Sequence, residues 1–141
     1  ALGHPPLIVD LMAKRDDDHV IAVYHAGGGS AIAKSNTTML RSREAVYRSL
    51  RELVMSYFDG YFNLHGYKSL RSYSAPVNLQ RFDALQWRTT AEPLDAIEEC
   101  LNTVRHYPLI SPKMERALSP AESLAIKACF LNSVRKGLYK P

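Results

Sequence analysis

Residues 43–58, REAVYRSLRELVMSYF, carry the strongest periodic pattern in the chain. The apolar residues of this stretch recur at the spacing of one helix face. They are Val46, Tyr47, Leu50, Leu53, Val54, Tyr57 and Phe58. Asp59-Gly60 follows, and glycine ends helices readily because it takes the left-handed conformation without steric cost. The pattern predicts one amphipathic helix over 43–58 that buries its apolar face.

Upstream of this helix, HVIAVYH at 19–25 is rich in β-branched and aromatic residues and runs into glycines 27–29. This composition predicts a mostly buried strand that ends in a tight loop. Residues 1–18 hold a short apolar turn and the charge run KRDDD, so we expect an N-terminal arm or lead-in helix there. Residues 30–42 are expected to form a polar connection.

Downstream, between residues 61 and 88, the apolar residues no longer recur at a helical spacing. This part of the chain holds three short, aromatic-rich and partly alternating runs, separated by Lys68-Ser69 and Pro76. They are YFNLHGYK, SLRSYSA and NLQRFDALQWR. Such runs are typical of a three-stranded antiparallel meander.

Three further helices are predicted towards the C-terminus. The first begins near Thr90 as N-cap and ends before Pro108, and a short one has Ser111 as N-cap. In the last, Ser119 is the N-cap, Pro120 is the first helical residue and Gly137 is the stop. We therefore expect an α+β fold, with three or more helices packed on a small, mainly antiparallel sheet in one domain over 1–141.

The composition indicates an ordinary globular protein. The 141 residues are 46% hydrophobic and 23% charged, which argues against a disordered chain. No apolar run approaches the roughly 20 residues that span a bilayer, and the first residues lack the plan of a signal peptide. A soluble, intracellular protein without membrane contact is expected.

Metal and cofactor chemistry find no support in the sequence. Cys100 and Cys129 lie in predicted helices without a CxxC motif, and the five histidines match no metal-ligand spacing. We expect no metal, no cofactor and no catalytic residue.

The glycine-rich stretch HAGGGSAIAKS at 25–35 allows three interpretations. It is similar to the His-Gly-Gly-Gly oxyanion element of α/β-hydrolase esterases, but the chain contains no GxSxG nucleophile motif. It also approaches a phosphate loop, with Ala33 in place of the second glycine before Lys34 and Ser35. The third interpretation is a glycine turn that could still bind an anion, through Gly27, Gly28, Gly29, Lys34 and Ser35.

A set of basic and aromatic residues suggests a binding surface. The net charge is +4 and the sequence pI is about 9.1, which suits an anionic partner. Arg48 and Arg51 lie three residues apart on the predicted helix, opposite its apolar face. The predicted meander mixes cations with rings that could stack on bases. The candidate contacts from both elements are Arg48, Arg51, Tyr67, Lys68, Arg71, Tyr73 and Arg88.

The stretch from Tyr47 to Pro76, with Tyr57, Tyr61, Tyr73 and the Ala75-Pro76 pair, resembles the central segment of the ArdB/KlcA antirestriction proteins. The resemblance spans about thirty residues and does not reach the region before Arg41. It implies a non-enzymatic protein that interferes with a host restriction system through protein contact.

The sequence thus favours binding over catalysis. RNA or DNA is the first expected partner, a second protein is the alternative, and a phosphate-loop or hydrolase-like enzyme ranks third.

Overall fold

The computed structural model describes residues 3–27, 30–35 and 40–135. Its strands are β1 (Leu7–Ala13), β2 (His19–Ala26), β3 (Ser30–Ser35), β4 (Leu70–Ser74), β5 (Val77–Asn78) and β6 (His106–Pro108). Its α-helices are α1 (Leu50–Met55), α2 (Asp95–Thr103), α3 (Pro112–Arg116) and α4 (Ser123–Arg135). Two 3-10 helices are η1 (Phe58–Gly60) and η2 (Leu79–Leu85). This is a small α+β fold, as predicted.

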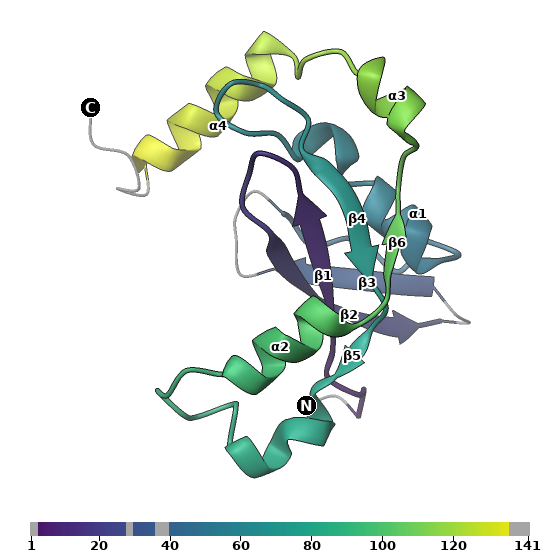
Figure 1. Cartoon of the computed structure of the whole chain (residues 1–141), viewed down its shortest axis with the longest axis vertical. Coiled ribbons are helices and arrows are strands. Elements are labelled where there is room, and N and C mark those ends of the chain that lie inside the picture. The colour runs from purple at the N-terminus through teal and green to yellow at the C-terminus, as the bar shows by residue number, and fades with distance from the viewer. Residues whose placement is uncertain (1–2, 28–29, 36–39, 136–141) are drawn as a thin grey trace.

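The strands form an antiparallel sheet in the order β3-β2-β1-β4-β6 (Figure 1). Strand β5 pairs with the first residues of β1, beside β4. The predicted β2 is confirmed, but the expectation of a polar connection over 30–42 is wrong for 30–35, which pair with β2 as β3.

Strand β1 lies at the centre of the sheet, so the expectation of an arm or lead-in helix over residues 1–18 is wrong for 7–13. Val9 and Leu11 are fully buried on one face, while Asp10 and Met12 point to the other. The KRDDD run forms the turn that joins β1 to β2, with Arg15 in the left-handed region at φ 62°. The apolar residues of this stretch therefore form a strand, and the charge run after it is exposed.

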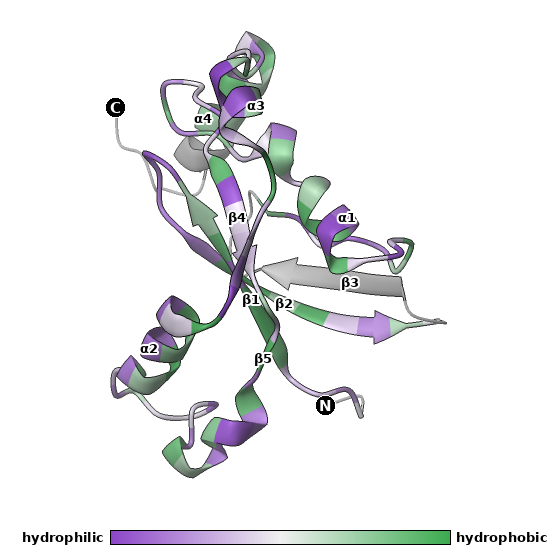
Figure 2. Cartoon of the chain, turned by 45° about the vertical axis from the view of Figure 1, so that its right-hand side comes forward, coloured by the Kyte–Doolittle hydropathy of each residue, from purple (hydrophilic) through white to green (hydrophobic). Residues whose placement is uncertain are grey.

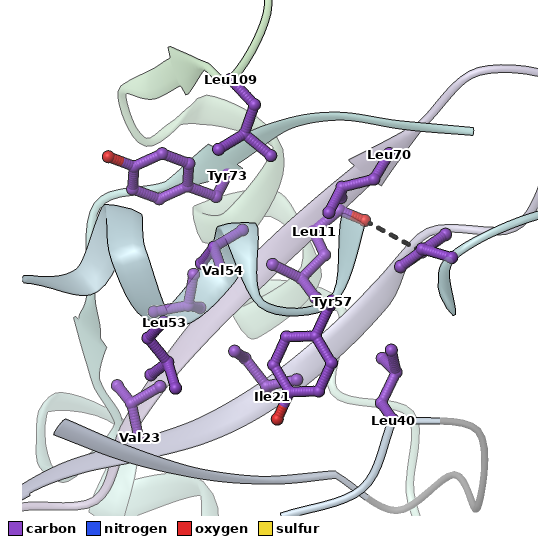
Figure 3. Packing of buried hydrophobic residues seen from close by; sticks show 12 residues of the cluster. Leu11, Ile21, Val23, Leu40, Leu53, Val54, Tyr57, Leu70, Tyr73 and Leu109 are labelled. Carbon is purple, nitrogen blue, oxygen red and sulfur yellow. Dashed lines mark hydrogen bonds between the residues drawn. The ribbon is translucent and has the colours of Figure 1, made fainter. Parts of the chain in front are cut away.

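The main core lies between one face of the sheet and α1. Figure 3 shows Leu53, Val54 and Tyr57 packed against strand residues such as Leu11 and Ile21. Burial of these side chains removes apolar surface from water, which is the dominant favourable term in folding.

A second, smaller core involves η2 and α2, which form a lobe over residues 79–103. Its buried residues are Val77, Leu79, Ile97 and Leu101. Figures 1 and 2 show α2 and α1 on opposite sides of the central strands. Of the predicted three-stranded meander, the middle run forms β4, but the last run, 78–88, is wrong as a strand. Asn78 caps η2 by accepting a hydrogen bond from the backbone N–H of Gln80, and Phe82 and Trp87 pack on the lobe.

The predicted helices exist, with shifted starts. Helix α1 begins at Leu50, where the Ser49 side chain is the N-cap and accepts a hydrogen bond from the backbone N–H of Glu52. The Arg43 guanidinium donates to Ser56 at the other end of the helix. Helix α2 begins at Asp95 instead of after Thr90, since the residue before Pro93 is driven out of the helical region. Ser111 caps α3 as predicted.

Helix α4 begins at Ser123, not after Ser119. The backbone N–H of Ala121 donates to the carbonyl of Gly66 at 2.8 Å, which holds residues 120–122 outside the helix. In the part of the chain that the structure describes, no helix combines the length and apolar character needed to cross a membrane.

Candidate functional site

The structure separates the predicted basic and aromatic residues into three groups. Arg48, Arg51 and Tyr73 lie near α1 and β6. Tyr67 and Arg71 contact Glu115 on α3, with Lys68 between them in sequence and paired with Asp59, and Arg88 lies on the η2–α2 lobe. Helix α1 and the η2–α2 lobe lie on opposite sides of the central strands (Figure 2), so Arg51 on α1 and Arg88 on the lobe are separated by the sheet. One continuous surface through all seven residues is therefore not formed.

The first group is centred on the contact between α1 and the end of β6. Arg51 donates hydrogen bonds from its two terminal nitrogens to the carbonyls of Pro108, at 3.0 Å, and Leu109, at 2.7 Å. Its planar fork suits two neighbouring acceptors. The exposed Arg48 lies three residues before it, and its side chain makes no hydrogen bond or ion pair with the described residues. Arg51 thus joins α1 to β6, while Arg48 faces solvent.

A stack of rings and a cation continues this group along the sheet. The guanidinium of Arg105 lies 5.1 Å from the centroid of the Tyr107 ring, which lies 5.5 Å from that of Tyr73. Tyr73 is only 8% exposed, so its ring belongs to the core and cannot stack on a base. Arg105 and Tyr107 were missed as site residues. Their alternation with Leu109 was the available signal, because it places all three on one face of a strand.

We call Arg48, Arg51 and Arg105 the α1–β6 basic surface. The two segments that carry it are basic: residues 41–56 hold four arginines and two glutamates, and residues 105–116 hold three basic residues and one glutamate. The η2–α2 lobe has the opposite balance, with two arginines and five acidic residues. The segments that carry the α1–β6 basic surface are therefore net basic, and the η2–α2 lobe is net acidic.

The second group surrounds the carboxylate of Glu115 on α3. Glu115 Oε1 lies 2.6 Å from Lys14 Nζ, 3.2 Å from the Tyr67 hydroxyl and 3.4 Å from Arg71 Nε. The Lys14 ammonium first, then the Tyr67 hydroxyl and the Arg71 charge, hold the pKa of Glu115 below its ordinary value. These contacts hold α3 against β4 and the β1–β2 turn.

The remaining donors of this group are also used inside the protein. Arg71 donates to the carbonyls of Lys68 and Leu70, both at 2.9 Å, and to the Tyr67 hydroxyl. Lys68 Nζ lies 2.7 Å from Asp59 Oδ1. Lys68 and Arg71 are 16% and 14% exposed, so both cations act mainly in the fold.

Arg88, the last predicted contact, pairs with Asp83 at 2.8 Å and lies 4.2 Å from the centroid of the Trp87 ring. Hydrogen bonds from Trp87 and Arg88 lower the pKa of Asp83. This exposed pair belongs to the acidic lobe and is remote from the α1–β6 basic surface.

The glycine-rich stretch leads into a strand. Gly27 takes a left-handed conformation, with φ 58°, at the end of β2. Lys34 and Ser35 pair with Ala22 and Ile21 as part of β3, whereas a phosphate loop leads directly into a helix. That structural requirement is not met. Gly28 and Gly29, and the side chains of Lys34 and Ser35, lie outside what the structure describes.

A buried polar cluster was also missed from sequence. Asp10, 8% exposed, has its Oδ2 3.2 Å from His106 Nε2, and its backbone N–H donates to Ser74 Oγ at 2.9 Å. Burial raises the pKa of Asp10, against the lowering effect of the His106 hydrogen bond. Ser74 Oγ accepts from the backbone instead of facing the imidazole, so the cluster lacks the serine–histidine contact of a hydrolase. Among the described residues, no three histidine, cysteine or acidic side chains meet as metal ligands.

Comparison with protein-family models and with curated proteins finds no match for the chain. The resemblance to the ArdB/KlcA proteins rests on residues 47–76 alone, where β4 and the Ala75-Pro76 bend follow α1 and η1.

Proposed function

We propose that the protein binds nucleic acid without catalysis and that the α1–β6 basic surface contacts the phosphate backbone. The observation that carries this proposal is that Arg48, Arg51 and Arg105 are exposed, while Arg51 bonds the end of β6 and Arg105 lies over the Tyr107 ring of the same strand. Arginine is favoured at phosphate contacts because its fork matches two phosphate oxygens.

The mode of binding follows from the surroundings of the rings. Tyr73 is buried, and Tyr107 is half-buried between Tyr73 and Arg105, which leaves little open ring surface for bases. Phosphate contacts position a protein on nucleic acid but carry no direct sequence information. We therefore expect salt-dependent binding with weak sequence preference, to RNA or DNA.

The test is fluorescence-anisotropy titration of labelled single-stranded RNA, single-stranded DNA and duplex DNA at about 50 and 200 mM salt. The informative variant is Arg48→Ala/Arg105→Ala, and Arg81→Ala/Arg88→Ala on the η2–α2 lobe is a control that loses the same charge. Arg51 is left intact because it also joins α1 to β6.

The expected result is binding that weakens at the higher salt and falls about tenfold or more in the Arg48→Ala/Arg105→Ala variant, while the control changes less than about threefold. In that variant, the slope of log affinity against log salt concentration should become shallower by an amount that corresponds to roughly two fewer released counterions. Equal losses in both variants would show that binding follows net charge and not this surface. No binding at the lower salt would overturn the proposal.

A protein partner is the second candidate, and α4 favours it. Leu124 and Leu131 are 75% and 69% exposed on one side of the helix, while Ile126, Cys129 and Phe130 line a cavity on the other. A helix that is apolar on both sides is usually covered by another protein surface. If that surface is a second copy, sedimentation velocity should show self-association that persists at about 500 mM salt and is lost in Leu124→Ser/Leu131→Ser. A monomer at all concentrations would exclude the second copy.

A further inference from the structure

A cavity of about 510 Å³ lies between the β1–β2 turn, the loop over residues 60–65 and α4. Figure 1 shows α4 passing beside the loop that precedes β4. Phe62, Leu64, Ile126 and Phe130 supply apolar walls, and Asp16 and Asp17 stand at the turn. Ligand pockets for small molecules have volumes of roughly 300–1,000 Å³ and mostly apolar walls with a few polar groups, so this cavity has a suitable size and lining.

The walls are held in place by contacts that a ligand would not have to break. The Tyr61 hydroxyl donates to the carbonyl of Asp17 at 2.8 Å, and Asn63 Nδ2 donates to the carbonyl of Arg15 at 3.1 Å. These bonds join the loop to the β1–β2 turn. On the other side, the Ala121 N–H bonds the carbonyl of Gly66 and ties the start of α4 to the same loop.

The charge at the turn is negative. The Asp16 carboxylate accepts hydrogen bonds from the Ser69 hydroxyl, at 2.6 Å, and from the backbone N–H of Asp17, at 3.0 Å. The Asp17 carboxylate makes no hydrogen bond or ion pair with the described residues and is exposed. Asp16 and Asp17 therefore both line this end of the cavity, and of these two carboxylates only that of Asp16 receives a hydrogen bond from the described residues.

Arg15, the basic residue next to Asp16 in the sequence, has its guanidinium against an aromatic ring. Arg15 lines the cavity, but its guanidinium lies over the Tyr67 ring, 5.3 Å from the centroid, and Tyr67 is not a lining residue. Burial, and next the charges of the neighbouring aspartates, raise the pKa of Tyr61, in keeping with a negative potential at this wall. His19 and His65 are the other titratable side chains on the lining, besides Cys129 and Tyr61.

We propose that this cavity binds a small organic cation, with an apolar body between α4 and the loop and a protonated amine against Asp17 and Asp16. An organic anion would meet two carboxylates, and an inorganic cation would gain nothing from the apolar walls. A protonated amine on an apolar body fits both the apolar walls and the two aspartates of the turn. This site is separate from the α1–β6 basic surface and does not depend on nucleic-acid binding.

The experiment uses two fluorescent probes that share one aromatic group: dansylcadaverine, which carries a primary amine, and dansylglycine, which carries a carboxylate. Each is titrated with the full chain at about pH 8, where an alkylamine is still protonated. The emission rise on transfer from water to an apolar cavity reports binding. We expect dansylcadaverine to bind at least about tenfold more tightly than dansylglycine, a preference set by charge.

Variants of the lining residues test which side chains bind the amine probe. Asp17→Asn should weaken dansylcadaverine binding about threefold, as expected for a solvent-exposed ion pair, and Asp17→Lys at least about tenfold. Asp95→Asn on α2 is the matched control and should change affinity less than about twofold. Leu64→Ala, at a residue 64% exposed on the lining, should weaken both probes because it removes apolar wall.

Circular dichroism of each variant checks the fold. Equal affinity for the two probes, or unchanged dansylcadaverine binding in both Asp17 variants, would overturn the recognition of a cation. Absence of dansylcadaverine binding up to about 1 mM, the weak end of measurable affinities, would overturn the site itself.

Discussion

His106 Nε2 lies 3.2 Å from Asp10 Oδ2, a contact between residues 96 positions apart that joins the edge strand β6 to the central strand β1. The other ring nitrogen of His106 lies 2.8 Å from the carbonyl of Val104. With an acceptor at each nitrogen, the ring donates to both only when it is protonated. The contact therefore ties the packing of β6 to the buried Asp10 carboxyl.

The first prediction concerns the pH dependence of stability in Asp10→Asn. Burial, with a smaller contribution from Asp18, raises the pKa of Asp10 above 3.8, although the His106 hydrogen bond opposes this. A raised carboxyl pKa means that the folded state favours the protonated form, so this contribution to the free energy of unfolding is complete below pH 3.8 and is lost as pH rises through the folded-state pKa.

Asp10→Asn removes that titration. The free energy of unfolding of the native chain minus that of Asp10→Asn should therefore fall as pH rises from about 3.8 and then level off. Urea unfolding of both proteins at a series of pH values between about 3 and 7 measures the difference. A difference that grows with pH would show that ionised Asp10, paired with His106, is the favoured form.

The second prediction concerns the arginine that joins α1 to β6. Arg51→Ala removes two hydrogen bonds to the carbonyls of Pro108 and Leu109 and should lower the free energy of unfolding by about 1 kcal/mol. Arg51→Lys should restore only part of it, because an ammonium group lacks the planar fork. Arg48→Ala is the control, and urea denaturation should place it within about 0.5 kcal/mol of the native chain. Equal effects of Arg48→Ala and Arg51→Ala would contradict the assigned contact.

The third prediction tests the main core. Leu53 is fully buried between α1 and the sheet (Figure 3), so Leu53→Ala leaves a cavity and should cost about 2–5 kcal/mol. Leu124→Ala, at a residue 75% exposed, should cost less than about 0.5 kcal/mol of folding free energy. Thermal or urea unfolding of the two variants in parallel gives the comparison. A loss below about 1 kcal/mol for Leu53→Ala would contradict its place in the core.

The elements that sequence predicted well are those fixed by local chemistry. Residues 19–25 form β2 because β-branched residues and a following glycine turn suit a strand, and Ser111 with Pro112 starts α3. The stretch 7–13 was misassigned because Asp10 interrupts its apolar pattern. That carboxyl is buried beside His106, which is distant in sequence, and the Asp10 backbone N–H donates to Ser74 Oγ.

The same limit applies to the candidate site. Residue type alone selected Lys68 and Arg71, but Asp59 and Glu115 pair with them in the fold. The partner of Lys68 lies nine residues away in sequence. The partner of Arg71 lies on α3, which follows β6 in the sequence, whereas Arg71 itself is in β4. Only tertiary structure distinguishes these bound cations from the exposed Arg48.

The last prediction concerns Gly66, which connects the loop before β4 to α4. Its φ of +75° is a conformation that L side chains rarely adopt, and a Cβ at this position would lie 2.6 Å from Ile126 Cδ1. Gly66→Ala should therefore lower the free energy of unfolding by at least about 1 kcal/mol, through backbone strain and displacement of the Ile126 side chain.

Gly60→Ala is the matched control, because Gly60 has no heavy atom within 4 Å of the added carbon and its φ lies outside the left-handed region. It should change stability by less than about 0.5 kcal/mol. Gly66→Ala/Ile126→Ala separates the two costs, since it removes the steric contact and keeps the backbone strain. Compared with Ile126→Ala alone, the added Gly66→Ala should then cost less stability than it does in the native chain.

Hydrogen exchange should show faster exchange of α4 amides in Gly66→Ala than in Gly60→Ala, because the displaced Ile126 loosens the helix from the loop. Equal stability of the two alanine variants would contradict both the backbone strain at Gly66 and its contact with Ile126.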